Sequence, residues 1–140
     1  MKQEPLTVGD CMTPAKALVP AKASVTEAVQ ILLKNRLFGS PVVDEYHNLV
    51  GYISEQDCIK HLLSDSYYRQ NSVQVTDLMR TDVLTVSADD SIIDLAEKMT
   101  GNKPKKYPVI DEKRVVGEIT RTEVLAALLK LRSWHQKRSA

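Results

Sequence analysis

Cysteine, histidine motifs, long apolar runs and any excess of charge are scarce in this 140-residue sequence, and each shortage excludes a class of protein. The two cysteines, Cys11 and Cys58, lie far apart and form no C-x-x-C or other zinc spacing, so we expect reduced packing thiols. His47, His61 and His135 show no H-x-H or H-E-x-x-H spacing, and there is no G-x-S-x-G nucleophile motif. We therefore expect no metal site, no catalytic residue and no required cofactor.

Charge and hydropathy narrow the possible partners. Nineteen basic and eighteen acidic residues give a formal net charge of +1, which offers no global attraction to nucleic acid or to an anionic membrane. The longest apolar run, Val124 to Leu129, is far too short to cross a bilayer, and the segment MKQEPLTVGD lacks the apolar core of a signal peptide. We expect a cytoplasmic protein with no membrane partner.

What the sequence does contain is an internal repeat. Residues 8–45 align with residues 75–112 without a gap, and after one extra residue near Tyr46 the match resumes, with residues 49–63 against 115–129. A polar stretch rich in turn formers, residues 64–72, joins the two copies. The sequence therefore predicts two copies of one structural unit.

Each copy begins with the signals of a short strand and a helix. The strand is expected near residues 17–19 in the first copy and 83–86 in the second. Ser24-Val-Thr-Glu27 and Ser91-Ile-Ile-Asp94 are typical of helix N-termini and precede apolar residues at helical spacing. Asn35 and Gly101 are expected to end these helices.

A β-hairpin and a second helix complete each copy. Apolar runs that begin at Pro41 and Pro108 are followed by a polar turn and a second apolar run. The second helix is expected to start at Ser54 or Thr120. Since a unit of about sixty residues buries little surface alone, we predict an α+β protein of two βαββα repeats, packed together with pseudo-twofold symmetry. The predicted boundaries are 1–66 and 67–130 for the repeats, and 131–140 for a basic tail.

An ordered set of short motifs recurs in both copies. The first copy has a D-x-M-T start at residues 10–13, a P-V-V-D strand at residues 41–44, and L-V-G-x-I-S-x-x-D at residues 49–57. The set resembles the CBS domain, the repeat named after cystathionine β-synthase, which occurs in tandem pairs called Bateman modules. The resemblance covers nearly the whole chain.

The resemblance implies a regulatory function. Members of this family commonly bind AMP, ADP, ATP, S-adenosylmethionine or cyclic dinucleotides in the cleft between the repeats and regulate an attached or partner protein. We expect a stand-alone sensor or accessory subunit, without an attached catalytic or transport domain, that acts on an unknown protein. Such modules often form a disc-shaped homodimer, which we also expect.

The first candidate site is built around Ser54 and Asp57. By themselves they form a helix cap, in which the hydroxyl accepts from the backbone and the acid favours the positive helix end. The resemblance implies that the serine lines the ligand cleft and that the aspartate accepts hydrogen bonds from both ribose hydroxyls. The remaining wall would come from Leu18, Ser40, Pro41 and Val42. Pro41, Val42 and the neighbouring Val43 could equally be only sheet core.

The second candidate site departs from the family pattern, because Thr120 and Glu123 replace the serine and aspartate. Thr-x-x-Glu is a better match to a capping box, and this interpretation is favoured. The turn before the second hairpin is nevertheless basic, and relatives often carry phosphate-binding residues there. Lys105 and Lys106 are the predicted phosphate ligands, with Arg121 third. Thr85, Tyr107 and Pro108 are further candidates for this site, Tyr107 for stacking on a base.

Two alternatives to the adenosyl sensor remain open. In the first, the chain is a purely structural or protein-interaction module whose clefts are empty. In the second, it binds nucleic acid through the turn at Lys103–Lys106 and the basic tail. The near-neutral net charge makes nucleic acid the less expected partner.

Overall fold

The computed structural model describes residues 6–68 and 73–139, with side chains at 6–64 and 73–134, and these residues form two compact units. The N-repeat unit contains residues 16–68, 73–83 and 113–115. The C-repeat unit contains residues 6–15, 84–112 and 116–139. The units therefore do not coincide with the two sequence repeats. The first residues of repeat 1, up to residue 15, belong to the C-repeat unit, and the first residues of repeat 2, 75–83, belong to the N-repeat unit.

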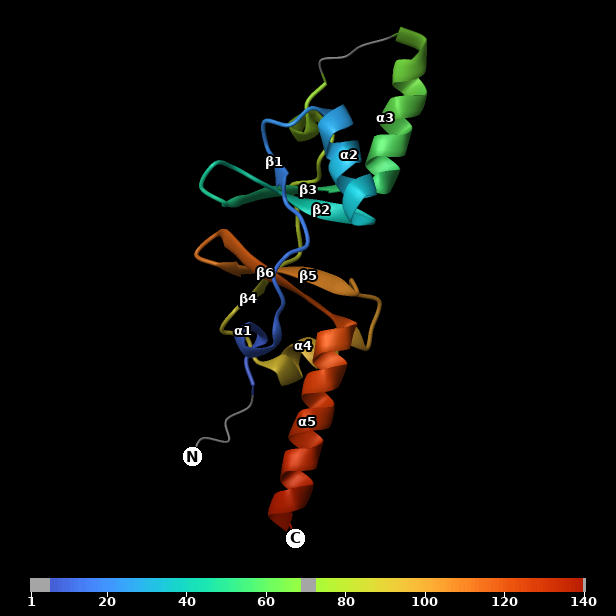
Figure 1. The fold of residues 1–140 in the computed structure, drawn as a ribbon. Helices are drawn as coiled ribbons and strands as arrows, with labels where there is room; N and C mark the ends of the chain where they lie inside the picture. The colour runs from blue at the N-terminus through green and yellow to red at the C-terminus, as the bar shows by residue number, and fades with distance from the viewer. Residues whose placement is uncertain (1–5, 69–72, 140) are drawn as a thin grey trace. The chain divides into compact units, whose positions relative to one another are not determined.

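The N-repeat unit is a three-stranded sheet with two helices (Figure 1). Strand β2 is central, parallel to β1 and antiparallel to β3, and α2 and α3 pack against each other. The elements are β1 (Val19–Pro20), α2 (Val25–Asn35), β2 (Gly39–Val43), β3 (Leu49–Ser54), α3 (Glu55–Tyr68) and a 3-10 turn, η1 (Val75–Asp77).

The C-repeat unit has the same plan. Its sheet has the order β4-β5-β6, with β4 parallel to β5, and its two long helices α4 and α5 pack together. The elements are α1 (Val8–Cys11), β4 (Val86–Ser87), α4 (Ile92–Met99), β5 (Lys106–Asp111), β6 (Arg114–Thr120) and α5 (Arg121–Ser139). The predicted α+β class and the βαββα order of each repeat are confirmed.

Several boundaries differ from the sequence-based expectation. The short strands β1 and β4 lie at the C-terminal edge of the predicted segments, at residues 19–20 and 86–87. The predicted linker at 64–72 begins inside α3, which ends at Tyr68, and residues 69–72 lie outside the described residues. The predicted tail is helical as far as Ser139, and the side chain of His135 is not among those described. Both helices continue through polar residues, since local composition alone does not end a helix.

The first long helix of each repeat starts where the sequence predicts. Ser24 accepts a hydrogen bond from the Glu27 N–H at 3.1 Å, and the Glu27 carboxylate accepts from the Ser24 N–H at 2.8 Å, which completes a capping box. Ser91 accepts from the N–H groups of Ile93 and Asp94 at 3.1 and 3.4 Å. The predicted apolar faces turn inward. Their buried members are Val25, Ala28, Leu32, Ile92, Leu95 and Met99.

Helix α2 ends on an arginine in the left-handed conformation. Arg36 has φ 55° and ψ 51°, a region that favours glycine. We expect Arg36→Gly to raise the free energy of unfolding by about 0.5–1 kcal/mol, because relief of the steric cost exceeds the added entropy of the unfolded chain. Differential scanning calorimetry would show this as a rise of about 3 °C in Tm. Lys34→Gly, inside the same helix, should instead lower stability by about 1 kcal/mol. A loss of equal size in both variants would contradict the strain at Arg36.

The first residues of each repeat bind to the other repeat's helix and sheet. In the C-repeat unit, the Val8 N–H donates to the Asp90 carbonyl at 2.8 Å, and the Ile92 N–H donates to the Leu6 carbonyl at 3.0 Å. In the N-repeat unit, the Val75 N–H donates to the Ala23 carbonyl at 2.9 Å. Val8 and Val75 are both completely buried, so each exchanged segment carries a core residue into its unit.

The D-x-M motif of each repeat has a defined place in this exchange. Asp10 and Asp77 accept hydrogen bonds from the N–H groups of Thr7 and Gln74 at 2.9 and 3.0 Å, and so close two short helical turns. The hydrogen bonds from the Thr7 backbone and side chain lower the pKa of Asp10. The methionine that follows packs against a glycine of the other repeat's hairpin: Met12 beside Gly117, and Met79 beside Gly51.

The buried residues of the described chain form one hydrophobic cluster in each unit. The N-repeat cluster contains Val19, Ala23, Val25, Ala28, Leu32, Leu37, Val42, Ile53, Cys58 and Val75. The C-repeat cluster contains Val8, Val86, Ile92, Leu95, Met99, Tyr107, Val109, Ile119, Val124 and Ala127. Among the described helices, none is long and apolar enough to span a membrane.

Candidate functional site

The Ser54–Asp57 pair lies where β3 meets α3. The Asp57 carboxylate oxygen Oδ2 accepts from the Ser54 N–H at 3.2 Å and from the Ser54 hydroxyl at 2.8 Å, while that hydroxyl accepts from the Asp57 N–H at 3.2 Å. The pair is therefore a helix cap. Within the described part of the chain, Oδ1 of Asp57 has no hydrogen-bond partner, and Asp57 is only half-buried. One oxygen with two lone pairs is left to accept donors from outside.

The wall next to this pair comes from the start of β2. Gly39 is the register partner of Ser54, so Ser40 and Pro41 lie beside the cap. The two-residue strand β1 pairs with Val42 and Val43, and strand pairing on that side of β2 stops there. The Ser40 hydroxyl, completely buried, donates to the Ala17 carbonyl at 3.0 Å and so ties the approach to β1 onto β2.

The structure thus brings the predicted residues of the first site together at one end of one sheet. Leu18 is half-buried immediately before β1, and Pro41 and Val42 are buried in β2. The arrangement has a fixed carboxylate on one side and a backbone edge with apolar neighbours on the other. Such a wall can hold a flat, hydrogen-bonding ring beside a diol.

The equivalent pair in the C-repeat unit is also a helix cap. Oε1 of Glu123 accepts from both the N–H and the hydroxyl of Thr120 at 2.6 Å, and the Thr120 hydroxyl accepts from the Thr122 N–H at 3.2 Å. The additional methylene of Glu123 is taken up within the cap. Both acids therefore use one oxygen for their helix and leave the other without a partner among the described residues.

The basic residues of the second site have different surroundings. Lys105 is exposed, and its carbonyl accepts from the Arg121 N–H at 3.1 Å, which places the two side by side. The exposed Arg121 also donates through Nη2 to the Met99 carbonyl at 3.3 Å, at the end of α4. Lys106 is not free: its Nζ lies 3.3 Å from Oε1 of Glu118.

The remaining candidates of the second site line the start of β5. Thr85 is half-buried just before β4, and Pro108 is buried in β5. Tyr107 is 3% exposed and belongs to the C-repeat core, and this burial raises the pKa of its phenol. A ring held in the core is better placed for packing than for stacking on a base.

Sequence reasoning missed Glu118. It is 6% exposed in β6, and its backbone exchanges two hydrogen bonds with Thr13 at 2.8 and 2.9 Å. The available signal was a lone acid inside the apolar run from Val115 to Ile119, because a buried carboxylate needs a partner. Its partner, Lys106, could be identified only from the strand pairing.

The thiols and the acidic groups give no sign of other chemistry in the described residues. Cys58 is buried, and burial raises the pKa of its thiol, with further increases from the charges of Asp57 and Glu55. Burial likewise raises the pKa of the half-buried Cys11 thiol. Both are therefore poor nucleophiles. Within the described ranges, no group of three histidine, cysteine, aspartate or glutamate side chains is arranged to hold a metal ion.

The comparison with protein families gives a match across both repeats. The family model of the CBS domain matches residues 8–64 and 75–130. Among curated relatives, an uncharacterized protein of Methanocaldococcus jannaschii, MJ1225, is 31% identical over 106 residues, which cover 76% of this chain and 37% of the relative. The chloroplastic CBS domain-containing protein CBSX1 of Arabidopsis thaliana is 30% identical, with 90% of this chain and 65% of the relative covered. The chain thus spans less than two thirds of these relatives.

Solved structures with the same fold include two with adenosyl compounds. CBSX2 in complex with AMP has a TM-score of 0.73 and 30% identity, over 91% of this chain and 98% of that one. The CBS domain pair of MJ0100, in complex with 5′-methylthioadenosine and S-adenosyl-L-methionine, has a TM-score of 0.67 and 28% identity, over 89% and 97%.

Proposed function

The chain belongs to the CBS domain family, and from that premise we propose that it is a regulatory module that binds an adenosine-containing ligand and passes the signal to a partner protein. The observation that carries the proposal is the Ser54–Asp57 cap, which fixes a carboxylate and leaves its Oδ1 open beside the wall of Ser40 and Pro41. The likeness to CBSX2 with AMP and to the MJ0100 pair with adenosyl compounds supports this class of ligand.

The first site would hold the ribose and the base. Oδ1 of Asp57 can accept from both hydroxyls of a vicinal diol, because each carboxylate oxygen has two lone pairs. The cap keeps this carboxylate oriented without any ligand. Backbone groups of residues 39–41, where pairing with β1 has ended, would meet the edge of the adenine.

The second site would hold a negatively charged group of a ligand, such as a phosphate. Lys105 and Arg121 are exposed and adjacent, and a lysine and an arginine together suit a phosphate group. In this proposal Asp57 is both a cap and a ligand acceptor, Glu123 is a cap, and neither has to transfer a proton. We therefore propose a binding module without catalytic activity.

Ligand binding should stabilise the folded chain. At a concentration one hundred times its dissociation constant, a ligand should add about 2.7 kcal/mol to the free energy of unfolding. A thermal-shift screen of AMP, ADP, ATP, S-adenosylmethionine and cyclic dinucleotides would detect this as a rise in Tm. Guanosine monophosphate is the control for the base. Equal shifts with adenosine and guanosine monophosphates would contradict base recognition, and no shift with any compound would favour the interaction module.

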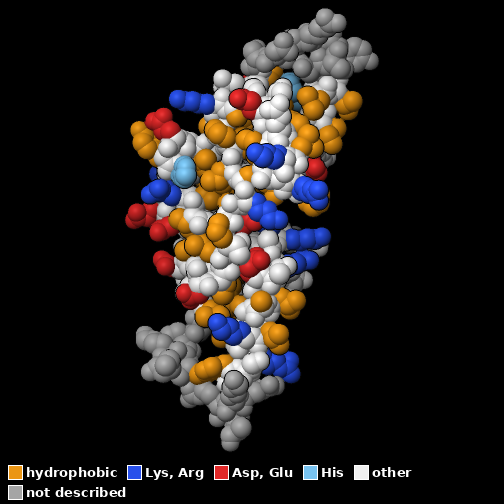
Figure 2. All heavy atoms as spheres, viewed as in Figure 1, with side chains coloured by type: hydrophobic (Ala, Val, Ile, Leu, Met, Phe, Trp, Pro, Cys, Tyr) orange, Lys and Arg blue, Asp and Glu red, His pale blue; other side chains and the backbone are white. Residues whose placement is uncertain are grey.

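A protein-interaction module is the second candidate because the helices expose large apolar side chains. Figure 2 shows hydrophobic side chains over α2 and α3, where Leu33 and Leu63 are 69% and 68% exposed. This surface also fits the expected homodimer, which stays a prediction, as does a cytoplasmic location. Sedimentation analysis of the free chain, with and without the ligand found in the screen, would separate self-association from ligand binding.

A further inference from the structure

The ion pair between Lys106 and Glu118 sets the second site apart. Nζ of Lys106 and Oε1 of Glu118 are 3.3 Å apart, and the glutamate side chain is 8% exposed against 30% for the lysine. Lys106 is the charged partner of this buried carboxylate in the described chain. Removing one member of a buried pair is strongly unfavourable, since the other charge is left unpaired. Lys106 is therefore held by Glu118 and cannot turn to a ligand without a penalty.

The ion pair lies at the wall of the second site. Glu118 and Thr120 are two residues apart in β6, so their side chains share one face and their Cα atoms are about 7 Å apart. Lys106 directly follows Lys105, whose carbonyl binds the Arg121 N–H. The pair therefore belongs to the same two segments as Lys105 and Arg121, and its charges act on a group bound there.

The fold itself does not require this pair. At the equivalent positions of the N-repeat the chain has Gly39 and Tyr52, and a Cβ on Gly39 would lie 2.6 Å from the Tyr52 ring. Contact between these two positions is thus kept in both repeats, with a glycine and an aromatic ring in one and opposite charges in the other. The charge pair is therefore a feature of the C-repeat alone and not of the repeat as such.

Six charged residues lie in the two segments that form the second site, residues 103–106 and 118–123. Four are cationic and two are anionic, which leaves a surplus of two positive charges. They are Lys103, Lys105, Lys106, Arg121, Glu118 and Glu123. A phosphate monoester carries about −1.5 to −2 at neutral pH, which this surplus matches. Without the Glu118 charge the surplus would be three and Lys106 would be released.

We infer that Glu118 is a specificity-determining residue: by holding Lys106, it makes the second site favour a nucleoside monophosphate over the corresponding triphosphate. This inference rests on the proposed function, since it concerns the ligand of that site. Lys105 and Arg121 bind the single phosphate, and the fixed carboxylate repels the additional charge of a longer phosphate chain.

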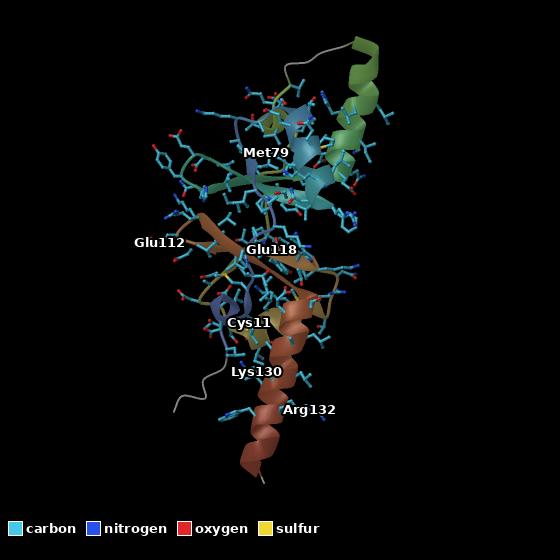
Figure 3. All side chains as sticks on the ribbon, viewed as in Figure 1. Cys11, Met79, Glu112, Glu118, Lys130 and Arg132 are labelled. Carbon is cyan, nitrogen blue, oxygen red and sulfur yellow. The ribbon has the colours of Figure 1, made fainter. Side chains whose placement is uncertain are left out.

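The test is the ratio of the dissociation constants for ATP and AMP, measured by titration calorimetry on the whole chain. The adenosine part is common to both ligands, so the ratio reports the phosphate contacts. The unaltered chain should bind AMP more tightly. Glu118→Gln should shift the ratio toward ATP by about tenfold. Removing one negative charge close to the phosphate chain should change the relative affinity by about this factor. Glu112→Gln, which removes the same charge in the turn between β5 and β6, should leave the ratio unchanged (Figure 3).

A second variant separates charge from packing. The double variant Lys106→Met, Glu118→Gln removes both charges of the pair, so the surplus of two positive charges at the second site is unchanged. It should therefore keep the preference for AMP over ATP, even if its Tm changes. Binding of both nucleotides with a ratio that Glu118→Gln does not alter would overturn the inference and leave the proposed function standing. Failure of the unaltered chain to bind any adenosyl compound would overturn both.

Discussion

Gly51→Ala should lower the free energy of unfolding by about 2–3 kcal/mol, the upper part of the usual range for overpacking. A Cβ at this position would lie 2.4 Å from Sδ of Met79 and 2.7 Å from the Arg80 carbonyl oxygen. Methionine can move aside, but the carbonyl belongs to backbone that is paired with β3. The Tyr52 N–H donates to that same carbonyl at 2.9 Å, and the Arg80 N–H donates back to the Tyr52 carbonyl at 2.9 Å.

Urea denaturation would measure this loss, and the chain supplies its own control. Gly101 lies in an open turn, where the nearest atom to a new Cβ would be the Lys98 carbonyl oxygen at 3.9 Å, so Gly101→Ala should change stability little. Gly117→Ala should behave like Gly51→Ala, because its Cβ would lie 2.7 Å from the Thr13 carbonyl oxygen. Equal, small effects at Gly51 and Gly101 would refute the close approach of the exchanged segment.

Asp57→Ala should weaken adenosyl binding by about 100-fold. The change removes the open Oδ1 and with it two charge-assisted hydrogen bonds to the ribose, each worth about 1.5–3 kcal/mol, less the bonds to water that the free groups regain. Titration calorimetry with the ligand that gives the largest thermal shift would measure the loss. Asp57→Asn keeps an acceptor for the cap, so it should be as stable as the unaltered chain. It should nevertheless bind the adenosyl ligand more weakly than the unaltered chain does, because the negative charge is lost.

Glu123→Ala is the matched control for Asp57→Ala. It removes the same kind of cap, whose loss should cost about 1 kcal/mol of stability in either unit. We nevertheless expect ligand affinity to fall no more than about threefold, because the second site relies on Lys105 and Arg121. Equal losses of affinity in both variants would contradict the proposed difference between the sites, and unchanged affinity in Asp57→Ala would exclude the ribose assignment.

The caps show how far sequence reasoning reaches. Ser24 with Glu27, and Ser54 with Asp57, could be predicted because a cap joins residues three positions apart, and no distant part of the chain can alter that spacing. The sequence left a choice between a cap and a ligand contact at Asp57; the cap is confirmed, and the ligand contact stays a prediction. The structure adds that the cap occupies Oδ2 and leaves Oδ1, so the two roles are compatible.

Other features could not be predicted because they depend on strand register and on contacts across the repeats. Lys106 appears in the sequence as one of several lysines in a polar turn, and only its place opposite β6 shows that Glu118 neutralises it. Helix α3 extends to Tyr68, through residues whose composition indicated a linker. Composition is a weak guide where helix packing provides the stability.

By itself, the sequence determined the repeat, the βαββα order, the helix starts and the resemblance to the CBS family. All of these are written in local spacing and in the similarity of one copy to the other. Only the tertiary structure decided that each unit takes its first segment from the other copy, with Met12 against Gly117 and Met79 against Gly51. The physical reason is that two copies of one motif offer equivalent partners, and only long-range packing can choose between them.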